Sequence, residues 1–478
     1  MRNLLLIPLI FLIACTPTSG FPAATVAASP AIAADTPALT AVPPTAAATP
    51  SATPAAPARP HYELHLTLDY AAHLAGVVEN ITYTNQTATA LPELVLAVEP
   101  HLWPASFLLT DLTVDAKPVT PDLNGERMTI KLPGPLAPGQ SVAVEVGYEL
   151  ELPVENQRYM YGYDAHQTNL LDWYPFIVPY KDGWVLHTPA PVGEHLVYPS
   201  ADFDVFLRFA NSTTPPVVAA SAQGVPEGEW THYRLEGARS FALSASDRFL
   251  TSTAQAGNIP VTSYYFDGQQ QAGQQAAAIA AQAVQLFSQK FAPYPYRSLS
   301  IVESASSDGM EADGLFFMAG SFYGSYNGTL ENYLTTLSVH ETAHQWWYAL
   351  VGNDQATEPW LDEALATYSE RIFYAAEYPK EVDWWWYFRI RRYEPVGAAN
   401  ADIYANGSFR TYTNASYFMG AYFLDDLRVR IGDQAFYAAL ADYASQNAGK
   451  IATAQDFFAA VDRNTGVDYS DIVKQYFK

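Results

Sequence analysis

The residues with the clearest potential for chemistry lie in SVHETAHQWWYALVGNDQATEPWLDEALATY, residues 338–368. This segment places His340, Glu341, His344 and Glu363 in a stretch that is otherwise rich in Trp, Tyr, Leu and Ala. Burying carboxylates and imidazoles without partners would cost several kcal/mol. A divalent metal ion removes this cost, because two histidines at i and i+4 lie one helical turn apart and can direct their ring nitrogens at one point.

The third metal ligand has to come from another part of the chain. Glu363 follows His344 after 18 intervening residues, which is enough for a helix end, a turn and a second helix packed against the first. Two histidines and one glutamate leave a fourth position open to water, the usual arrangement of a catalytic zinc site. We therefore predict one Zn²⁺ per chain, held by His340, His344 and Glu363, with Glu341 as the general base.

Two more carboxylates, Asp362 and Glu370, lie close to Glu363 in the sequence. Such residues can accept a hydrogen bond from a metal-binding histidine and so orient its ring. They can equally well lie on the solvated face of the helix. The sequence leaves both alternatives open.

Hydrophobic periodicity predicts the elements that position these residues. Apolar residues at helical spacing predict a helix over 329–351, with Thr329 as its N-cap and Gly352 as its end, and a second helix over 360–377. The same reasoning predicts a helix over 268–291, a strand over 297–304 and a mostly helical chain after Tyr417.

The chain from Tyr62 to about Thr251 has a different pattern. Short segments alternate apolar with polar residues and are separated by Pro, Gly, Asn and Asp, which is typical of half-buried antiparallel strands. We predict an α+β multidomain fold, in which an antiparallel β-sheet or sandwich domain (61–255) precedes an α-rich catalytic domain with short C-terminal helices (256–478).

Composition narrows the classes of function. The chain of 478 residues contains 25 basic and 49 acidic residues, a net charge of −24, and it has no cluster of Lys or Arg that would neutralise phosphates. We therefore expect no nucleic-acid partner.

The N-terminus predicts export. MRNLLLIPLIFLIAC has a basic start and a short apolar run that ends at Cys15, the only cysteine, so internal disulfides are excluded. We interpret residues 1–15 as a lipoprotein signal peptide with a lipobox, and residues 16–60, rich in Ala, Thr and Pro, as a disordered tether. Lipid on Cys15 would anchor the protein on the outer face of a bacterial cell membrane. The alternative is an ordinary signal peptide with an incidental cysteine.

The spacing of the metal motif resembles a known family. HExxH, 18 residues and then Glu363 within W-L-x-E-x-x-A-x-Y are similar to the gluzincin zinc metallopeptidases of the aminopeptidase N family. The resemblance covers about residues 62–478. It implies a thermolysin-like catalytic domain that hydrolyses N-terminal residues from peptides with a free N-terminus.

A second segment, DGMEADGLFF (308–317), resembles the Gly-x-Met-Glu-Asn loop of that family. The resemblance implies that Glu311, preceded by Gly309 and Met310, binds the α-amino group of the substrate while the loop backbone pairs with the peptide. Asp308 stands in place of the first Gly, and Ala312 in place of the Asn.

A third segment, SYFMGAYFLDDLR, resembles the Tyr-x-x-Gly-Ala segment of the family and implies that Tyr417 donates a hydrogen bond to the oxyanion. Tyr412 and Tyr422 lie close by in the sequence. Relatives usually carry a second amine anchor from the β domain, for which Asp172 and Asn169 are the candidates here.

Long relatives also carry a large C-terminal helical domain, whereas this sequence ends 61 residues after Tyr417. A more open site is therefore expected, and two rival functions remain. One is a zinc endopeptidase or another zinc hydrolase on the same scaffold. The other is a surface-binding protein without activity.

Overall fold

The computed structural model describes residues 59–154 and 160–478. The predicted signal peptide, Cys15 and almost all of the predicted tether lie outside these ranges, so their interpretation stays a prediction. None of the helices within the two ranges has both the length and the apolar composition needed to cross a membrane.

The N-terminal region contains three sheets. The largest has eight strands, β1 (His61–Asp69), β2 (Leu74–Thr84), β4 (Phe107–Val114), β5 (Lys117–Pro118), β8 (Ser141–Glu151), β12 (Ala201–Phe209), β14 (Gly224–Glu227) and β15 (Trp230–Ala238). A four-stranded sheet consists of β3 (Leu91–Ala97), β6 (Asp122–Asn124), β7 (Arg127–Leu136) and β11 (Phe176–Ile177). The third consists of β9 (Tyr161–Tyr163), β10 (Thr168–Leu170), β13 (Val217–Ala220) and β16 (Leu243–Ser246).

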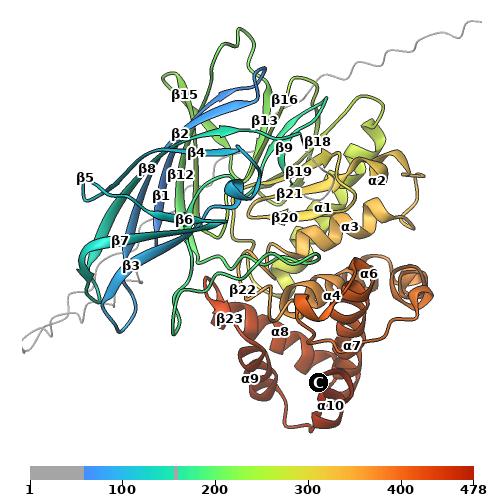
Figure 1. Cartoon of the computed structure of the whole chain (residues 1–478). Coiled ribbons are helices and arrows are strands. Elements are labelled where there is room, and N and C mark those ends of the chain that lie inside the picture. The colour runs from blue at the N-terminus through green and yellow to red at the C-terminus, as the bar shows by residue number, and fades with distance from the viewer. Residues whose placement is uncertain (1–58, 155–159) are drawn as a thin grey trace, which may run out of the picture. The chain divides into compact units, whose positions relative to one another are not determined.

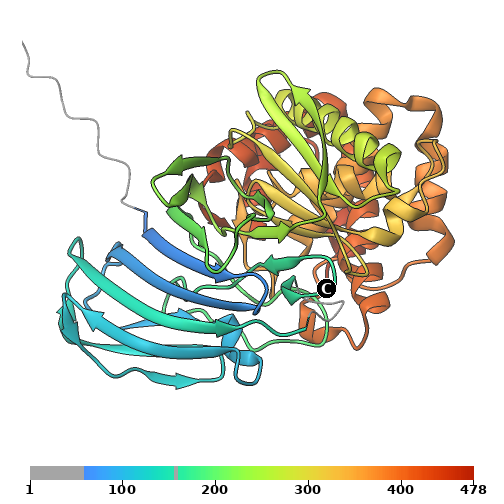
Figure 2. The ribbon, with the colours of Figure 1, turned by 90° about the horizontal axis from the view of Figure 1, so that it is seen from above.

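The predicted alternation determines which side chains enter the core of this region. In β1 every second side chain is buried, and these residues share one hydrophobic core with buried residues of β3, β7 and β8. The ribbon in Figures 1 and 2 shows that these strands lie together on one side of the molecule.

The sequence predicted antiparallel strands throughout the N-terminal region. That prediction is wrong for one pair, because β1 pairs in parallel with β12. Between β1 and β12 the chain forms strands of the other two sheets. It then comes back to the eight-stranded sheet, where β12 lies beside β1 and runs in the same direction.

Glu79 is an exception to the apolar core. It occupies an inward position of β2, opposite Leu64 on one side and Val146 on the other, and its side chain is fully buried. Neither carboxylate oxygen has a hydrogen-bond partner within the described part of the chain. Burial raises the pKa of Glu79 well above its ordinary value.

This burial predicts a pH dependence of stability. Below the pKa of an unfolded Glu, about 4.5, the carboxyl is neutral in both states. As the pH rises above that value, the unfolded chain ionises while the fold keeps the proton, so wild-type stability falls until the raised folded pKa is reached. We expect Glu79→Gln to gain about 2 kcal/mol or more in unfolding free energy, relative to the wild type, between pH 4.5 and pH 8.

Urea unfolding at the two pH values measures this change. Glu145→Gln, at an exposed position of the neighbouring strand β8, is the control and should show no comparable gain. The prediction would be contradicted if the free energies of unfolding of Glu79→Gln and the wild type differed by the same amount at both pH values.

The second region begins with a five-stranded sheet. Its strands are β17 (Leu250–Ala256), β18 (Ile259–Tyr265), β19 (Leu299–Ser304), β20 (Met310–Ala312) and β21 (Leu315–Ala319), in the order β17-β18-β19-β21-β20. The sequence placed the domain boundary between residues 255 and 256, which is inside β17. The first strand of the five-stranded sheet begins earlier, at Leu250. The helix α1 (Gln270–Lys290) packs on the sheet and on α3 (Tyr333–Ala343), as Figure 1 shows.

The chain after Tyr417 is mostly helical, as predicted, and α4 has the predicted bounds. The remaining helices of the second region are α2 (Gly320–Gly324), α4 (Trp360–Glu377), α5 (Val382–Trp385), α6 (Phe409–Tyr412), α7 (Gly420–Ile431), α8 (Asp433–Asn447), α9 (Ala454–Asn464) and α10 (Ser470–Tyr476). A π-helical turn, η6 (Thr413–Met419), joins α6 to α7. Two short strands, β22 (Gly352–Asn353) and β23 (Ile451–Ala452), pair with each other.

The helix predicted over 329–351 is shorter than expected at both ends. It starts after Asn332, whose side chain accepts a hydrogen bond from the Thr335 amide, so Asn332 rather than Thr329 is the N-cap. The α-helix ends at Ala343, with His344 as its C-cap. Tyr348 has φ 138°, which no helix accommodates, and such strained backbone is typical of functional sites.

Candidate active site

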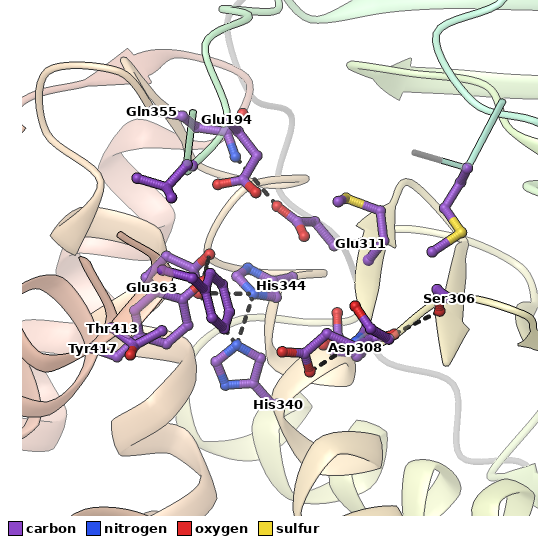
Figure 3. Close-up of a pocket in the computed structure, with 18 of the residues that line it drawn as sticks. Glu194, Ser306, Asp308, Glu311, His340, His344, Gln355, Glu363, Thr413 and Tyr417 are labelled. Carbon is purple, nitrogen blue, oxygen red and sulfur yellow. Dashed lines mark hydrogen bonds and ion pairs between the residues drawn. The ribbon is translucent and has the colours of Figure 1, made fainter. Parts of the chain in front are cut away.

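The three predicted metal ligands, His340, His344 and Glu363, converge on one point (Figure 3). His340 Nε2 lies 3.2 Å from His344 Nε2 and 3.3 Å from Glu363 Oε2. His344 Nε2 is 3.6 Å from the same carboxylate oxygen. The histidines come from α3 and Glu363 from the first turn of α4, which packs against α3. All three side chains are buried.

The hydrogen bonds of the two imidazoles show that this arrangement fits a cation. His340 Nδ1 lies 2.8 Å from a Glu370 oxygen, and His344 Nδ1 lies 3.0 Å from the Trp347 carbonyl. Both partners are acceptors, so each Nδ1 carries the proton and each Nε2 presents a lone pair to Glu363. Three lone pairs facing one another repel unless a cation lies between them.

The separations also fit zinc. Tetrahedral ligands about 2.1 Å from Zn²⁺ lie about 3.4 Å apart. The observed range of 3.2–3.6 Å agrees with that value. These residues could therefore hold a zinc ion with one position left open.

The two additional carboxylates are both buried, which excludes the solvated alternative. Besides His340, Glu370 accepts hydrogen bonds from Trp385 Nε1 (2.8 Å) and Arg389 Nε (3.0 Å). Glu370 therefore fixes the ring of His340, one of the predicted metal ligands. Asp362 instead accepts a hydrogen bond from the Glu363 amide (2.7 Å).

We expect Glu370→Gln to lower the affinity for Zn²⁺ by roughly 10–100-fold, because the amide is a weaker acceptor for the His340 N–H. Competition with a chromophoric chelator measures the affinity. Glu377→Gln, at the exposed end of the same helix, is the control. A change of less than about twofold for Glu370→Gln would show that Glu370 does not support the ligand.

Glu341 lies beside the convergence point. Its side chain is 3% exposed, and its Oε2 has no hydrogen-bond partner in the ranges that the structure covers. Burial raises the pKa of this carboxyl well above its ordinary value. A Cβ at Gly309 would lie 2.0 Å from Glu341 Oε1, so the segment 308–317 can approach this carboxylate only because residue 309 is glycine.

The loop with Glu311 forms an acidic end of the site. Glu311 is buried, accepts a hydrogen bond from Gln355 Nε2 (3.2 Å), and lies within 4.8 Å of Glu341 and His344. Met310 and Glu311 belong to β20, which is the edge strand of its sheet. An extended peptide can pair with such an edge.

Glu194 lies next to Glu311 and Gln355 in Figure 3. The following residue, His195, fixes this loop, because its Nε2 lies 2.8 Å from Glu126 and 3.7 Å from Glu99. The 2.8 Å separation is that of a hydrogen bond with a proton between the atoms. The interactions of His195 with Glu126 and Glu99 therefore serve to hold the loop that carries Glu194.

Of the three tyrosines near the Gly-Ala segment, Tyr417 lies at the centre. Its hydroxyl donates a hydrogen bond to Glu363 Oε1, and its ring stacks on His340 with centroids 5.9 Å apart. Tyr412 is buried and donates to Glu194 (3.4 Å), whereas Tyr422 stacks on Trp386.

The candidates for a second amine anchor have different positions. Asp172 lines the cavity, with its carboxylate bound by the Tyr198 hydroxyl (2.8 Å), and burial raises its pKa to about 6. Asn169 accepts hydrogen bonds from Gln167 and Ser244 and is not part of the cavity wall.

The sequence analysis missed Glu194 and Gln355. Both lie in loops without periodic patterning, and neither has a fixed spacing from the HExxH motif. The only available signal was the acidic residue in PVGEHL, within a segment rich in proline.

A cavity of about 740 Å³ connects these groups. Its wall includes the predicted metal ligands, Glu341, Glu311 and Tyr417 from the second region, and Asp172 and Glu194 from the first. This size is within the range of sites that enclose small ligands.

Comparison with known proteins agrees with this geometry. Residues 275–476 match the family model described as "Peptidase family M1 domain". The chain is 25% identical over 226 residues to Aminopeptidase M1-B of Oryza sativa subsp. japonica, covering 44% of this chain and 26% of the rice protein. It is 24% identical over 235 residues to Aminopeptidase M1 of Arabidopsis thaliana, covering 46% and 27%. The matched part thus spans about a quarter of these relatives.

Among solved structures, the M1 zinc metallopeptidase from Deinococcus radiodurans has a TM-score of 0.64 at 18% identity, covering 88% of this chain and 94% of that chain. A mutant of that protein bound to Tyr-ser-ala has the same values. This likeness establishes a shared fold across both regions and confirms the predicted fold class. Together with the sequence match, it identifies residues 275–476 as a peptidase family M1 domain.

Proposed function

We propose that the protein is a zinc-dependent aminopeptidase that removes N-terminal residues from peptides. The observation that carries this proposal is the position of Glu311, whose carboxylate lies within 4.8 Å of Glu341 and of the metal ligand His344. A substrate amine bound there has its first peptide bond next to the catalytic groups. Zinc, when bound, would polarise the scissile carbonyl and lower the pKa of a water molecule.

The residues of the chain have distinct roles in this scheme. Glu341 accepts a proton from the attacking water and later donates it to the leaving amine. Tyr417 turns its hydroxyl from Glu363 to the oxyanion that forms on the carbonyl. Glu311 and Glu194 bind the α-ammonium group, and the edge strand β20 pairs with the peptide backbone.

A panel of aminoacyl p-nitroanilides and their N-acetylated twins tests the proposal. We expect hydrolysis of the free-amine substrates only, loss of activity with a chelator, and an increase in KM of roughly 10–100-fold for Glu311→Gln, because the ammonium group loses a charged partner. Cleavage of the acetylated twins would contradict the aminopeptidase function and favour an endopeptidase. Zinc binding without any turnover would favour a binding protein.

We also propose that the protein is exported and anchored by lipid on Cys15 to the outer face of a bacterial membrane. The basic start, the apolar run and the position of the only cysteine support this proposal. Incorporation of labelled palmitate into the wild type, and its loss in Cys15→Ser, is the expected result. Equal membrane recovery of the two proteins without label would contradict it.

A further inference from the structure

A short hairpin carries Glu311, the proposed ammonium anchor. Its strands β20 and β21 are joined by a two-residue turn, Asp313 and Gly314. Gly314 has φ 67°, and a Cβ there would lie 2.1 Å from the Ser221 carbonyl oxygen, so this turn requires glycine. The strand β20 has three residues and pairs with β21 alone, so its sheet supplies few of the contacts that hold it in place.

Gln345, the residue directly after His344, connects this hairpin to the end of α3. Its Nε2 donates a hydrogen bond to the Ala312 carbonyl (2.9 Å), and its Oε1 accepts one from the Gly314 amide (2.9 Å). The side chain is fully buried. Both polar groups of one amide are therefore bound to the hairpin backbone, beginning at the residue next to Glu311.

The turn is also bound to other parts of the chain. Asp313 accepts hydrogen bonds from the Arg239 amide (3.0 Å), the Ser240 amide (2.8 Å) and the Ser240 hydroxyl (2.9 Å). It accepts a further one from the Tyr296 hydroxyl. These bonds hold the turn on the β region and on the segment before β19. Of the residues that bind the turn, Gln345 is the one that adjoins a predicted metal ligand.

An aminopeptidase needs its ammonium anchor and its metal ligands at a set separation. In the substrate, the α-amino nitrogen and the scissile carbonyl carbon are joined through one Cα, about 2.5 Å apart, and no rotation changes that distance. The Glu311 carboxylate lies within 4.8 Å of His344. If the hairpin moved by about 1 Å relative to α3, a substrate could reach the anchor or the metal but not both, and such a shift can cost roughly 10²-fold in rate.

We propose that Gln345 is a positioning residue that sets the distance between Glu311 and the metal ligands, and thereby directs hydrolysis to the first peptide bond. This inference rests on the proposed function, because it takes Glu311 to bind the α-ammonium group. Gln345 is not part of the cavity wall, so it acts through the hairpin and does not touch the substrate.

Peptide binding to zinc-loaded Glu341→Gln, which prevents turnover, tests this role. Calorimetry would compare Ala-Ala-Ala with its N-acetylated form, first in Glu341→Gln alone and then with Gln345→Met or Gln167→Met added. Methionine has nearly the length of glutamine but lacks its amide donor and acceptor. Gln167 is the matched control, because it is buried, donates a hydrogen bond to Asn169 (2.9 Å) and lies outside the cavity wall.

We expect the free-amine peptide to bind roughly tenfold more tightly than the acetylated peptide in Glu341→Gln, because the ammonium group makes a charge-assisted hydrogen bond with Glu311. Gln345→Met should reduce this ratio to about threefold or less by weakening the free-amine peptide alone, with one equivalent of zinc retained. Gln167→Met should leave the ratio in place. A purely structural role of Gln345 would lower the free energy of unfolding without changing the ratio.

Three results would overturn the inference, namely an unchanged ratio in zinc-loaded Gln345→Met, equal weakening of both peptides, or no preference for the free amine in Glu341→Gln. If Gln345→Met does not fold, Gln345→Asn takes its place, because it keeps the amide but is too short to make both hydrogen bonds. An unchanged ratio in that variant would overturn the inference equally. Absence of p-nitroanilide hydrolysis by the wild type would refute the proposed function, whereas the binding ratio would still decide the role of Gln345.

Discussion

Glu341→Gln is expected to lower kcat for an aminoacyl p-nitroanilide by roughly 10²–10⁴-fold, the range that general acid–base catalysis contributes. The amide has nearly the shape of the carboxylate, so the close approach of Gly309 is preserved. It cannot accept a proton from water or carry one to the leaving amine. KM should change little, because Glu341 is not part of the proposed ammonium site.

Two controls separate this loss from damage to the site. The variant should retain one equivalent of zinc, since Glu341 is not one of the three converging ligands. Glu303→Gln replaces another buried glutamate, which binds the Phe266 amide outside the cavity wall, and should leave kcat within about twofold. A Glu341→Gln variant with full zinc and more than a tenth of wild-type kcat would rule out Glu341 as the general base.

The largest expected effect on stability concerns Arg239, which is 3% exposed. Its guanidinium donates hydrogen bonds to five backbone carbonyls in three separate parts of the chain. They are those of Tyr198 (2.9 Å), of the consecutive residues Tyr348 (2.6 Å), Ala349 (3.1 Å) and Leu350 (3.3 Å), and of Lys450 (2.7 Å). The side chain thereby connects the β region, the backbone that follows His344 and the C-terminal helices.

We expect Arg239→Met to lower the free energy of unfolding by about 3–5 kcal/mol, because buried carbonyls lose their charged donor while the apolar stem is kept. Urea unfolding of the zinc-loaded protein measures this change. Arg208→Met is the control, since Arg208 binds the exposed Glu229 and lies on the Trp230 ring at the surface. Its loss should be about 1 kcal/mol or less. A similar loss of unfolding free energy in both variants would refute the stabilising role of the Arg239 hydrogen bonds.

The sequence predicted the elements whose own periodicity determines them. The helix over 360–377 and the strand near 297–304 formed because their apolar faces match the helical and strand repeats. The convergence of His340, His344 and Glu363 follows from the i,i+4 spacing and the length of the connection. These features depend on residues that are close together in the chain.

The features that were missed depend on contacts between distant segments. The apolar pattern continued past His344, but the strained Tyr348 and the carbonyls bound by Arg239 end the helix earlier. Glu194 reaches the acidic end from a loop of the β region, and its position follows from the sheets rather than from local sequence. The parallel pairing of β1 with β12 is likewise set by tertiary structure.

In the proposed mechanism one zinc ion, held by His340, His344 and Glu363, is required for aminopeptidase activity. The most direct measurement is titration of metal-depleted protein with Zn²⁺ while metal content and hydrolysis of a free-amine p-nitroanilide are followed together. We predict that activity is absent in the depleted protein, rises linearly and saturates at one equivalent of zinc per chain, with His344→Ala inactive throughout. Full activity in the depleted protein, or saturation of zinc binding at one equivalent without any activity, would contradict it.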